Sequence, residues 1–190
     1  IPGKSVYKYL SPKLKDIIRV VNVTSNNHFA EHIFRNLGAQ NDERGATVED
    51  SKRVIQKYWS DKGLDLSNIT LFDGNGLSPM DAISPEMVVG LLERMSKSEN
   101  AEYFKASLPL CGYEGTVKDL FVDSDMTVRA KSGSMTGVQA YAGYISFCER
   151  NFVFCVIVNE FDMARKDLRY EITRKIIQAL DNYACSFQRD

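Results

Sequence analysis

The chain has 190 residues, with 24 basic and 25 acidic side chains and a net charge of −1 at pH 7. This length predicts a single domain with a full hydrophobic core. The charge balance excludes a protein that coats nucleic acid, which needs a basic surplus. No apolar run approaches the roughly 18 residues of a membrane span. Four widely spaced cysteines, without a C-x-x-C pair, predict neither a zinc site nor a dense disulfide framework.

Helical patterns fill the first half of the chain. Two of them begin at an N-cap serine followed by proline, Ser11-Pro12 and Ser84-Pro85, and a third begins at Thr47. Another helix follows Ser25-Asn26-Asn27, where Ser25 alone would be an ordinary N-cap, and Gly38 is its predicted stop. Residues 69–72 predict a short strand that runs into a glycine-rich turn.

After residue 126 the pattern changes to one that is typical of strands. Three segments rich in β-branched and aromatic residues, 127–134, 138–147 and 152–161, predict an antiparallel meander with tight turns. A last helix over 165–184 carries apolar residues at helical spacing and should cover one face of the sheet. The predicted fold class is therefore α/β. Three strands are few for a sheet between helices.

Two short motifs carry chemistry when they are taken together. Ser25-Asn26-Asn27 is an S-x-N sequence on a helix, and Lys131-Ser132-Gly133-Ser134 is a K-[ST]-G sequence on a strand. They match two of the three signatures of penicillin-binding proteins and class A β-lactamases. A hydroxyl between two amines can relay the proton of a serine nucleophile, while the amines hold the developing charge. A glycine lets the strand approach a substrate, and the next N–H can donate in an oxyanion hole.

Further blocks follow in the order found in one family. They are Ser11-Pro12 with Leu14, Asn22-Val23-Thr24-Ser25-Asn26-Asn27 with Ala30-Glu31, Asp73-Gly74-Asn75-Gly76-Leu77-Ser78, Ser84-Pro85, Leu108-Pro109 with Gly115-Thr116, and Ala130-Lys131-Ser132-Gly133-Ser134-Met135-Thr136-Gly137-Val138 with Ala142-Gly143-Tyr144. With these blocks the chain resembles the D-alanyl-D-alanine carboxypeptidase/endopeptidases of the penicillin-binding protein 4 type, peptidase family S13. The resemblance covers nearly the whole chain and is most specific at the D-G-x-G-L-S and K-S-G blocks.

The resemblance implies the antiparallel α/β fold of serine β-lactamases and penicillin-binding proteins. It also implies cleavage of the terminal D-Ala-D-Ala bond, or of a peptide cross-link, in peptidoglycan stem peptides through an acyl-serine intermediate. Whether the enzyme prefers the carboxypeptidase or the endopeptidase reaction stays open. β-Lactam antibiotics would bind the same site. No cofactor and no nucleic acid is implied, and the location would be periplasmic or otherwise exported.

The resemblance also assigns roles to single residues. Ser25 would relay protons, Asn27 would bind the amide on the acyl side, and Lys131 would supply positive charge; these are the implied catalytic residues. The implied substrate-binding residues are Ser132, Gly133 and Ser134. The two serines would bind the terminal carboxylate, and the Ser134 N–H would lie in the oxyanion hole. We therefore expect the Lys131 ammonium within hydrogen-bond reach of the Ser25 hydroxyl.

The sequence departs from the family pattern in two places. Ser132 stands where the family usually has threonine, which keeps the hydroxyl and loses a methyl group. The nucleophile motif S-x-x-K, which the family carries far upstream, has a single match at Ser5 to Lys8, and chance alone predicts one. This match lies too close to Ser25. Because the chain also begins at Ile1, we expect residues 1–190 to be the C-terminal part of a catalytic domain, inactive alone. An open sheet edge would then favour self-association.

Two other function classes remain open. His28-Phe29-Ala30-Glu31-His32 matches H-x-x-E-H, a zinc-protease pattern in which both histidines would hold a metal and Glu31 would act as base. The alternative for these residues is a pair of surface histidines. Asp73 could be a catalytic carboxylate, but the interpretation favoured by the following glycine is a turn anchor. The chain could also be a non-catalytic peptidoglycan-binding module that retains the cleft without the nucleophile.

Overall fold

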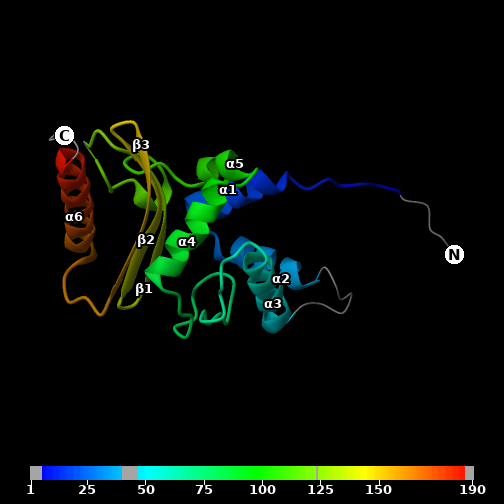
Figure 1. The fold of residues 1–190 in the computed structure, drawn as a ribbon. Helices are drawn as coiled ribbons and strands as arrows, with labels where there is room; N and C mark the ends of the chain where they lie inside the picture. Colours follow the sequence, from blue (N-terminus) through cyan, green and yellow to red (C-terminus); the bar gives the residue numbers. More distant parts are fainter. Residues whose placement is uncertain (1–5, 40–46, 123, 187–190) are drawn as a thin grey trace.

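The computed structural model describes residues 6–39, 47–122 and 124–186 and places a three-stranded sheet between helices (Figure 1). The strands are β1 (Thr127–Met135), β2 (Val138–Phe147) and β3 (Arg150–Asn159). The helices are α1 (Leu14–Thr24), α2 (Asn27–Ala39), α3 (Val48–Ser60), α4 (Pro85–Ser96), α5 (Ala101–Ser107) and α6 (Arg165–Ser186), with a short 3₁₀ helix η1 (Gly115–Val117). None of the described helices is long and apolar enough to cross a membrane.

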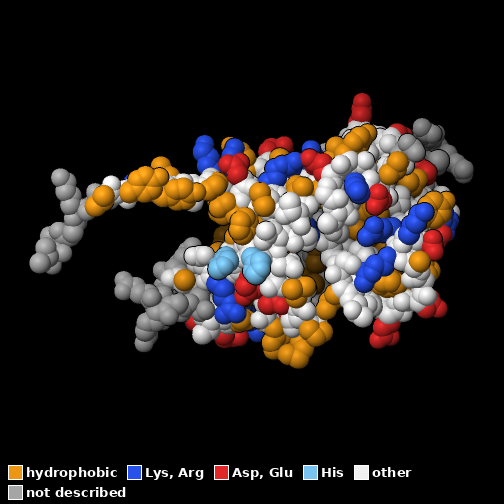
Figure 2. Space-filling model, turned by 180° about the vertical axis from the view of Figure 1, so that it is seen from behind, with side chains coloured by type: hydrophobic (Ala, Val, Ile, Leu, Met, Phe, Trp, Pro, Cys, Tyr) orange, Lys and Arg blue, Asp and Glu red, His pale blue; other side chains and the backbone are white. Residues whose placement is uncertain are grey.

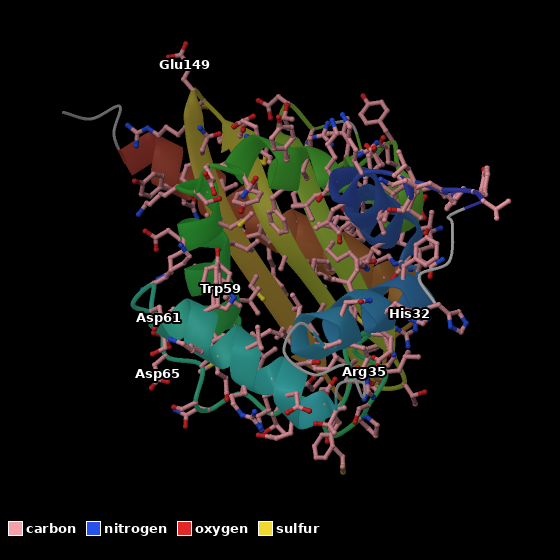
Figure 3. All side chains as sticks on the ribbon, turned by 90° about the vertical axis from the view of Figure 1, so that its right-hand side faces the viewer. His32, Arg35, Trp59, Asp61, Asp65 and Glu149 are labelled. Atoms are coloured by element: carbon pink, nitrogen blue, oxygen red, sulfur yellow. The ribbon has the colours of Figure 1, made fainter. Side chains whose placement is uncertain are left out.

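The sheet is the predicted antiparallel meander, in the order β1-β2-β3. The turn between β1 and β2 is Thr136-Gly137, in which Gly137 has a φ of 72° that suits glycine. The turn between β2 and β3 is made by Cys148 and Glu149, both with positive φ. Glu149 projects from the tip of this hairpin (Figure 3). The second turn lies earlier than the sequence indicated, so β3 begins at Arg150.

Helices cover both faces of the sheet. On one face, α6 buries Leu168 and Ile172 against Val128, Ala130 and Ile145 of the strands, which confirms the predicted role of the last helix. On the other face, a second cluster joins α4, the segment after α5 and β2 through the residues Leu92, Leu108 and Tyr144. The Tyr144 hydroxyl donates to the Leu92 carbonyl over 2.9 Å, which satisfies a buried polar atom. β1 and β2 are therefore fixed from both sides.

The remaining helices form a lobe beside the second face (Figure 1). α1 packs against α5, and the Asn22 side chain donates to the Ser107 hydroxyl across this contact at 2.8 Å. α2 and α3 pack against each other. α3 follows Thr47, as predicted, and Thr47 and Asp50 form a reciprocal capping box at its start. Ser84 caps α4 in the predicted way, with Pro85 as its first residue.

Three local predictions were wrong. α1 begins at Leu14 and not at Ser11-Pro12, because the backbone is still extended at Lys13, its N-cap, which makes no side-chain capping bond. α2 continues through Gly38, which is buried inside its last turn. Residues 69–72 form a single bridge between Thr70 and Ala82, since they pair with no strand of the described part of the chain.

Candidate active site

Ser25 lies in the short elbow between α1 and α2. Its backbone is left-handed, with φ 54° and ψ 48°, and its N–H donates to the Val21 carbonyl, so it caps the C-terminus of α1. Asn26 caps α2 instead, because its side-chain oxygen accepts the Phe29 N–H at 2.9 Å. The prediction of Ser25 as an N-cap was therefore wrong. A non-glycine residue in this region carries a backbone cost of about 1–3 kcal/mol, which is found most often at functional sites.

Lys131 reaches Ser25 from the sheet. Its Nζ donates to the Ser25 Oγ at 2.8 Å and to the Ser132 carbonyl at 2.5 Å. The predicted juxtaposition, between residues 106 positions apart, is confirmed. Lys131 makes no ion pair within the described ranges, and burial lowers the pKa of its ammonium group. Because Ser25 accepts the ammonium hydrogen, its own hydroxyl proton is available to a third group, as a proton relay requires.

The ladder of β1 leaves a row of backbone groups open at the same place. Met135 and Val138 flank a two-residue turn. In this register Met135, Gly133 and Lys131 form backbone hydrogen bonds with β2. The amides of the residues between them point to the other side. On that side, the segment after α5 pairs with the first part of β1: the Cys111 N–H donates to the Val128 carbonyl, and the Ala130 N–H donates to the Pro109 carbonyl. In the part of the chain that the structure describes, this pairing does not extend beyond Ala130. The amides of Ser132 and Ser134 therefore face the open edge.

Thr116 contacts this edge from η1. Its hydroxyl lies 2.6 Å from the Ser132 hydroxyl. The contact depends on Gly115, which has a φ of 54° and lies so close to α1 that a Cβ would be 2.2 Å from the Val23 carbonyl. Gly115-Thr116 contributed to the resemblance in the sequence, but nothing there indicated that Thr116 meets the K-S-G strand.

Asn27 is the first residue of α2, two positions after Ser25. It is exposed, and its side chain makes no hydrogen bond to any residue in the described part of the chain. Its amide is therefore available to a ligand beside Ser25. The structure thus brings Ser25, Lys131, Ser132 and Ser134 to one edge of the sheet, with Asn27 on the neighbouring helix.

The glycine-rich turn after residue 72 supports α2. Asp73 accepts the N–H groups of Asn75, Gly76 and Ser78, which agrees with the turn-anchor interpretation. Glu31 of α2 accepts the Gly74 N–H at 2.7 Å and also the Arg35 side chain at 2.7 Å. These two hydrogen bonds hold the pKa of the Glu31 carboxyl below its usual value, the one from Arg35 contributing most.

This arrangement disagrees with the zinc interpretation of His28, Glu31 and His32. Glu31 is occupied by the loop and by Arg35, whereas both histidines are exposed. Figure 2 shows the two histidine side chains together on the surface, and Figure 3 shows His32 at the outer side of α2. Among the described residues, no group of three or more His, Cys, Asp or Glu side chains is arranged to hold a metal ion.

The fold and the meeting of the S-x-N and K-S-G motifs define the serine β-lactamase and penicillin-binding protein class. The chain belongs to the D-Ala-D-Ala carboxypeptidase 3 (S13) family, whose model matches residues 1–183. A curated relative, the D-alanyl-D-alanine carboxypeptidase DacB of Haemophilus influenzae, is 26% identical over 148 residues, 76% of this chain and 31% of the relative. This chain spans about a third of the length of the curated relatives it matches.

Solved structures show the same fold. Penicillin-binding protein 4 of Haemophilus influenzae, in complex with a β-lactam, superposes with a TM-score of 0.79 at 22% identity, over 87% of this chain and 41% of that one. A class A β-lactamase from Mycobacterium abscessus gives a TM-score of 0.63 at 18% identity, over 88% of this chain and 65% of that one. The predicted fold class is therefore confirmed.

Proposed function

We propose that this chain is the C-terminal part of the catalytic domain of a serine-type D-alanyl-D-alanine carboxypeptidase or endopeptidase that acts on peptidoglycan stem peptides. The observation that carries the proposal is the 2.8 Å hydrogen bond from Lys131 to Ser25, which joins the two motifs. Ser25 then relays the proton between nucleophile and leaving nitrogen, and the Lys131 ammonium stabilises the charge that develops. Asn27 binds the amide on the acyl side.

The ligand lies along the open edge of β1 in this proposal. The Ser132 and Ser134 hydroxyls bind its terminal carboxylate, and the Ser134 N–H donates to the oxyanion of the tetrahedral intermediate. Gly133 leaves room for the ligand backbone, because it carries no side chain. β-Lactams acylate the same site. The enzyme is exported, in the periplasm or its equivalent, because peptidoglycan lies outside the cytoplasmic membrane.

The nucleophile of the acyl-enzyme is not among the residues brought together here. Ser5, the first residue of the one S-x-x-K match, lies outside the described residues. Relay and binding groups activate an attacking oxygen but do not replace it. The chain alone is therefore inactive, and an upstream S-x-x-K segment supplies the serine.

Acylation by a labelled penicillin tests the proposal. The 190-residue chain should take up no label and release no D-Ala from a D-Ala-D-Ala peptide, whereas the protein with its upstream S-x-x-K segment should be labelled. In that longer protein, Lys131→Ala should slow acylation by about 10²–10³-fold, as expected for loss of a main electrostatic stabiliser. Lys57→Ala, which removes an exposed lysine of α3, is the matched control and should have no effect.

Two results would contradict the proposal. Stoichiometric label on Ser5 of the 190-residue chain would make this a compact enzyme complete in itself. A longer protein that binds peptidoglycan peptides but is never acylated would be a binding module.

We further propose that the isolated chain associates with a second copy of itself through β3. In the described part of the chain, β3 pairs only with β2, so its other edge is unpaired. Such an edge recruits another strand, and β3 has Arg150 as its only charged residue to prevent this.

A further inference from the structure

Arg165, the first residue of α6, holds the end of β1. Its guanidinium donates to the Ser134 hydroxyl at 2.5 Å, to the Met135 carbonyl at 2.7 Å and to the Gln139 side-chain oxygen at 3.0 Å. Gln139 is 1% exposed, and its NH₂ group donates to the Gly133 carbonyl at 3.0 Å. Two side chains from α6 and β2 therefore fix three consecutive residues of the K-S-G strand.

Helix stability does not account for a cation at this position. Positive charge is unfavourable at a helix N-terminus, where the peptide dipoles already place partial positive charge. Within the described ranges Arg165 makes no ion pair with a carboxylate; its guanidinium also donates to the Val138 carbonyl at 3.4 Å and lies over the face of the Phe161 ring, at 5.4 Å. No carboxylate in the described ranges therefore offsets the positive charge of the guanidinium beside Ser134.

The contact with Arg165 also decides what the Ser134 hydroxyl can do. A hydroxyl has one hydrogen to donate and lone pairs that accept. Because its oxygen accepts from Arg165, the hydroxyl is left to donate its hydrogen to another group. Ser134 is exposed, and its hydroxyl donates to no residue in the described part of the chain, so a bound ligand can accept this hydrogen. A hydrogen bond that is polarised by a cation is strongest when the acceptor is an anion.

We propose that Arg165 is a positioning residue that acts through Ser134 and makes the site select ligands that end in a carboxylate. Arg165 fixes the hydroxyl as a donor, and Gln139, which Arg165 also contacts, holds the neighbouring Gly133 carbonyl. This inference rests on the proposed function, in which Ser134 meets the terminal carboxylate. It adds that the preference for the carboxylate depends on a residue of the last helix, 31 positions from Ser134.

The test compares two ligands that differ only at the end. N-acetyl-D-Ala-D-Ala and its C-terminal amide are titrated into the ¹⁵N-labelled 190-residue chain, and dissociation constants are taken from the shifts of the Gly133 and Ser134 amides. The unmodified chain should bind the acid about tenfold more tightly than the amide. Arg165→Ala should remove most of this ratio. Arg174→Ala removes an exposed arginine of the same helix that pairs with Glu171, and it should leave the ratio unchanged.

Two further variants separate positioning from general damage. Arg165→Lys keeps the charge but not the two-pronged donor, so it should recover only a small part of the preference. In a Ser134→Ala background, Arg165→Ala should have no further effect on the ratio. The inference would be overturned if Arg165→Ala kept the full ratio of the two dissociation constants, which includes the case in which it weakens binding of the acid and the amide equally. It would also be overturned if the unmodified chain showed no preference for the acid. Failure of the proposed function would instead be seen as absent acylation of the longer protein, which this binding experiment does not require.

Discussion

The ionised carboxylate of Glu31 connects α2 to the loop that follows Asp73. It accepts hydrogen bonds from the Gly74 N–H, the Asn75 side chain and Arg35. We expect Glu31→Gln to lower the free energy of unfolding at pH 7 by about 1.5 kcal/mol, the lower end for charged hydrogen bonds, because glutamine keeps one acceptor oxygen. Urea denaturation of both proteins measures this difference.

The pH dependence of this difference identifies its cause. The pKa of Glu31 is lowered in the folded protein, so its stabilising effect is complete above the unfolded value of 4.5 and is lost as the pH falls through the folded value. The gap between the unmodified chain and Glu31→Gln should therefore narrow below pH 4.5. Glu99→Gln, at an exposed position, should show no gap at any pH. A gap that stays constant from pH 7 to pH 3 would mean that shape, not charge, explains the effect.

For single residues, contacts between side chains were easier to predict from the sequence than backbone conformations. The S-x-N and K-S-G motifs led to the contact between Ser25 and Lys131, which the structure confirms. The left-handed conformation of Ser25 was missed, because serine before Asn26 is as typical of an N-cap as of an elbow. Arg165 was missed entirely, although a basic residue at a helix N-terminus is an unusual pattern that could have indicated it.

At the scale of secondary-structure elements, β1 and β2 approach closely where Gly143 pairs with Ala130. A Cβ at Gly143 would lie 2.0 Å from the Arg129 carbonyl and 2.7 Å from the Ala130 Cα. Gly143→Ala must therefore push β1 away from β2 and should destabilise the fold by about 3 kcal/mol, the upper end for overpacking. Because Lys131 follows Ala130, the same shift should lengthen its contact with Ser25. Thermal unfolding monitored by circular dichroism measures the loss.

Gly133→Ala is the matched control in the same ladder. A Cβ there would meet only the Ala140 Cβ, at an ordinary 3.6 Å. Its effect on stability should stay below about 1 kcal/mol. If both variants unfold alike, the two strands are not held as closely at Gly143 as the structure indicates.

The helices and strands themselves were predictable where local chemistry determines them. Ser84 caps its helix as expected, α3 follows Thr47 as expected, and the β-branched and aromatic residues after residue 126 predicted the three strands. The predictions failed where a distant partner decides. Residues 69–72 have the composition of a strand, but within the described ranges their only pairing is the bridge from Thr70 to Ala82. The turn at Cys148-Glu149 lacks the glycine or asparagine that marks positive φ, so the pattern placed it too late.

For the whole molecule, the open edge of β3 is the main consequence of having three strands. The groups at this edge can be identified from the ladder. The Glu160 N–H donates to the Gly137 carbonyl, just beyond the ends of β3 and β2. In this register the even-numbered residues of β3 form backbone hydrogen bonds with the odd-numbered residues of β2, and the odd-numbered residues of β3 do not. The amides of Val153, Cys155 and Ile157 therefore point outward. An apolar groove of about 450 Å³ lies beside this edge, between β3 and α6, and includes Val156, Val158 and Ile172.

A second copy that adds its β3 to this edge would pair the open amides and cover part of the groove. We expect the 190-residue chain to dimerise as its concentration rises, as measured by sedimentation equilibrium. Cys155→Pro removes one N–H that points outward and leaves every hydrogen bond between β3 and β2 in place. It should therefore weaken association and preserve the fold. Val156→Pro removes an inward N–H and should unfold the sheet instead. A chain that stays monomeric at millimolar concentration, or a Cys155→Pro variant that dimerises unchanged, would show that β3 is not the contact.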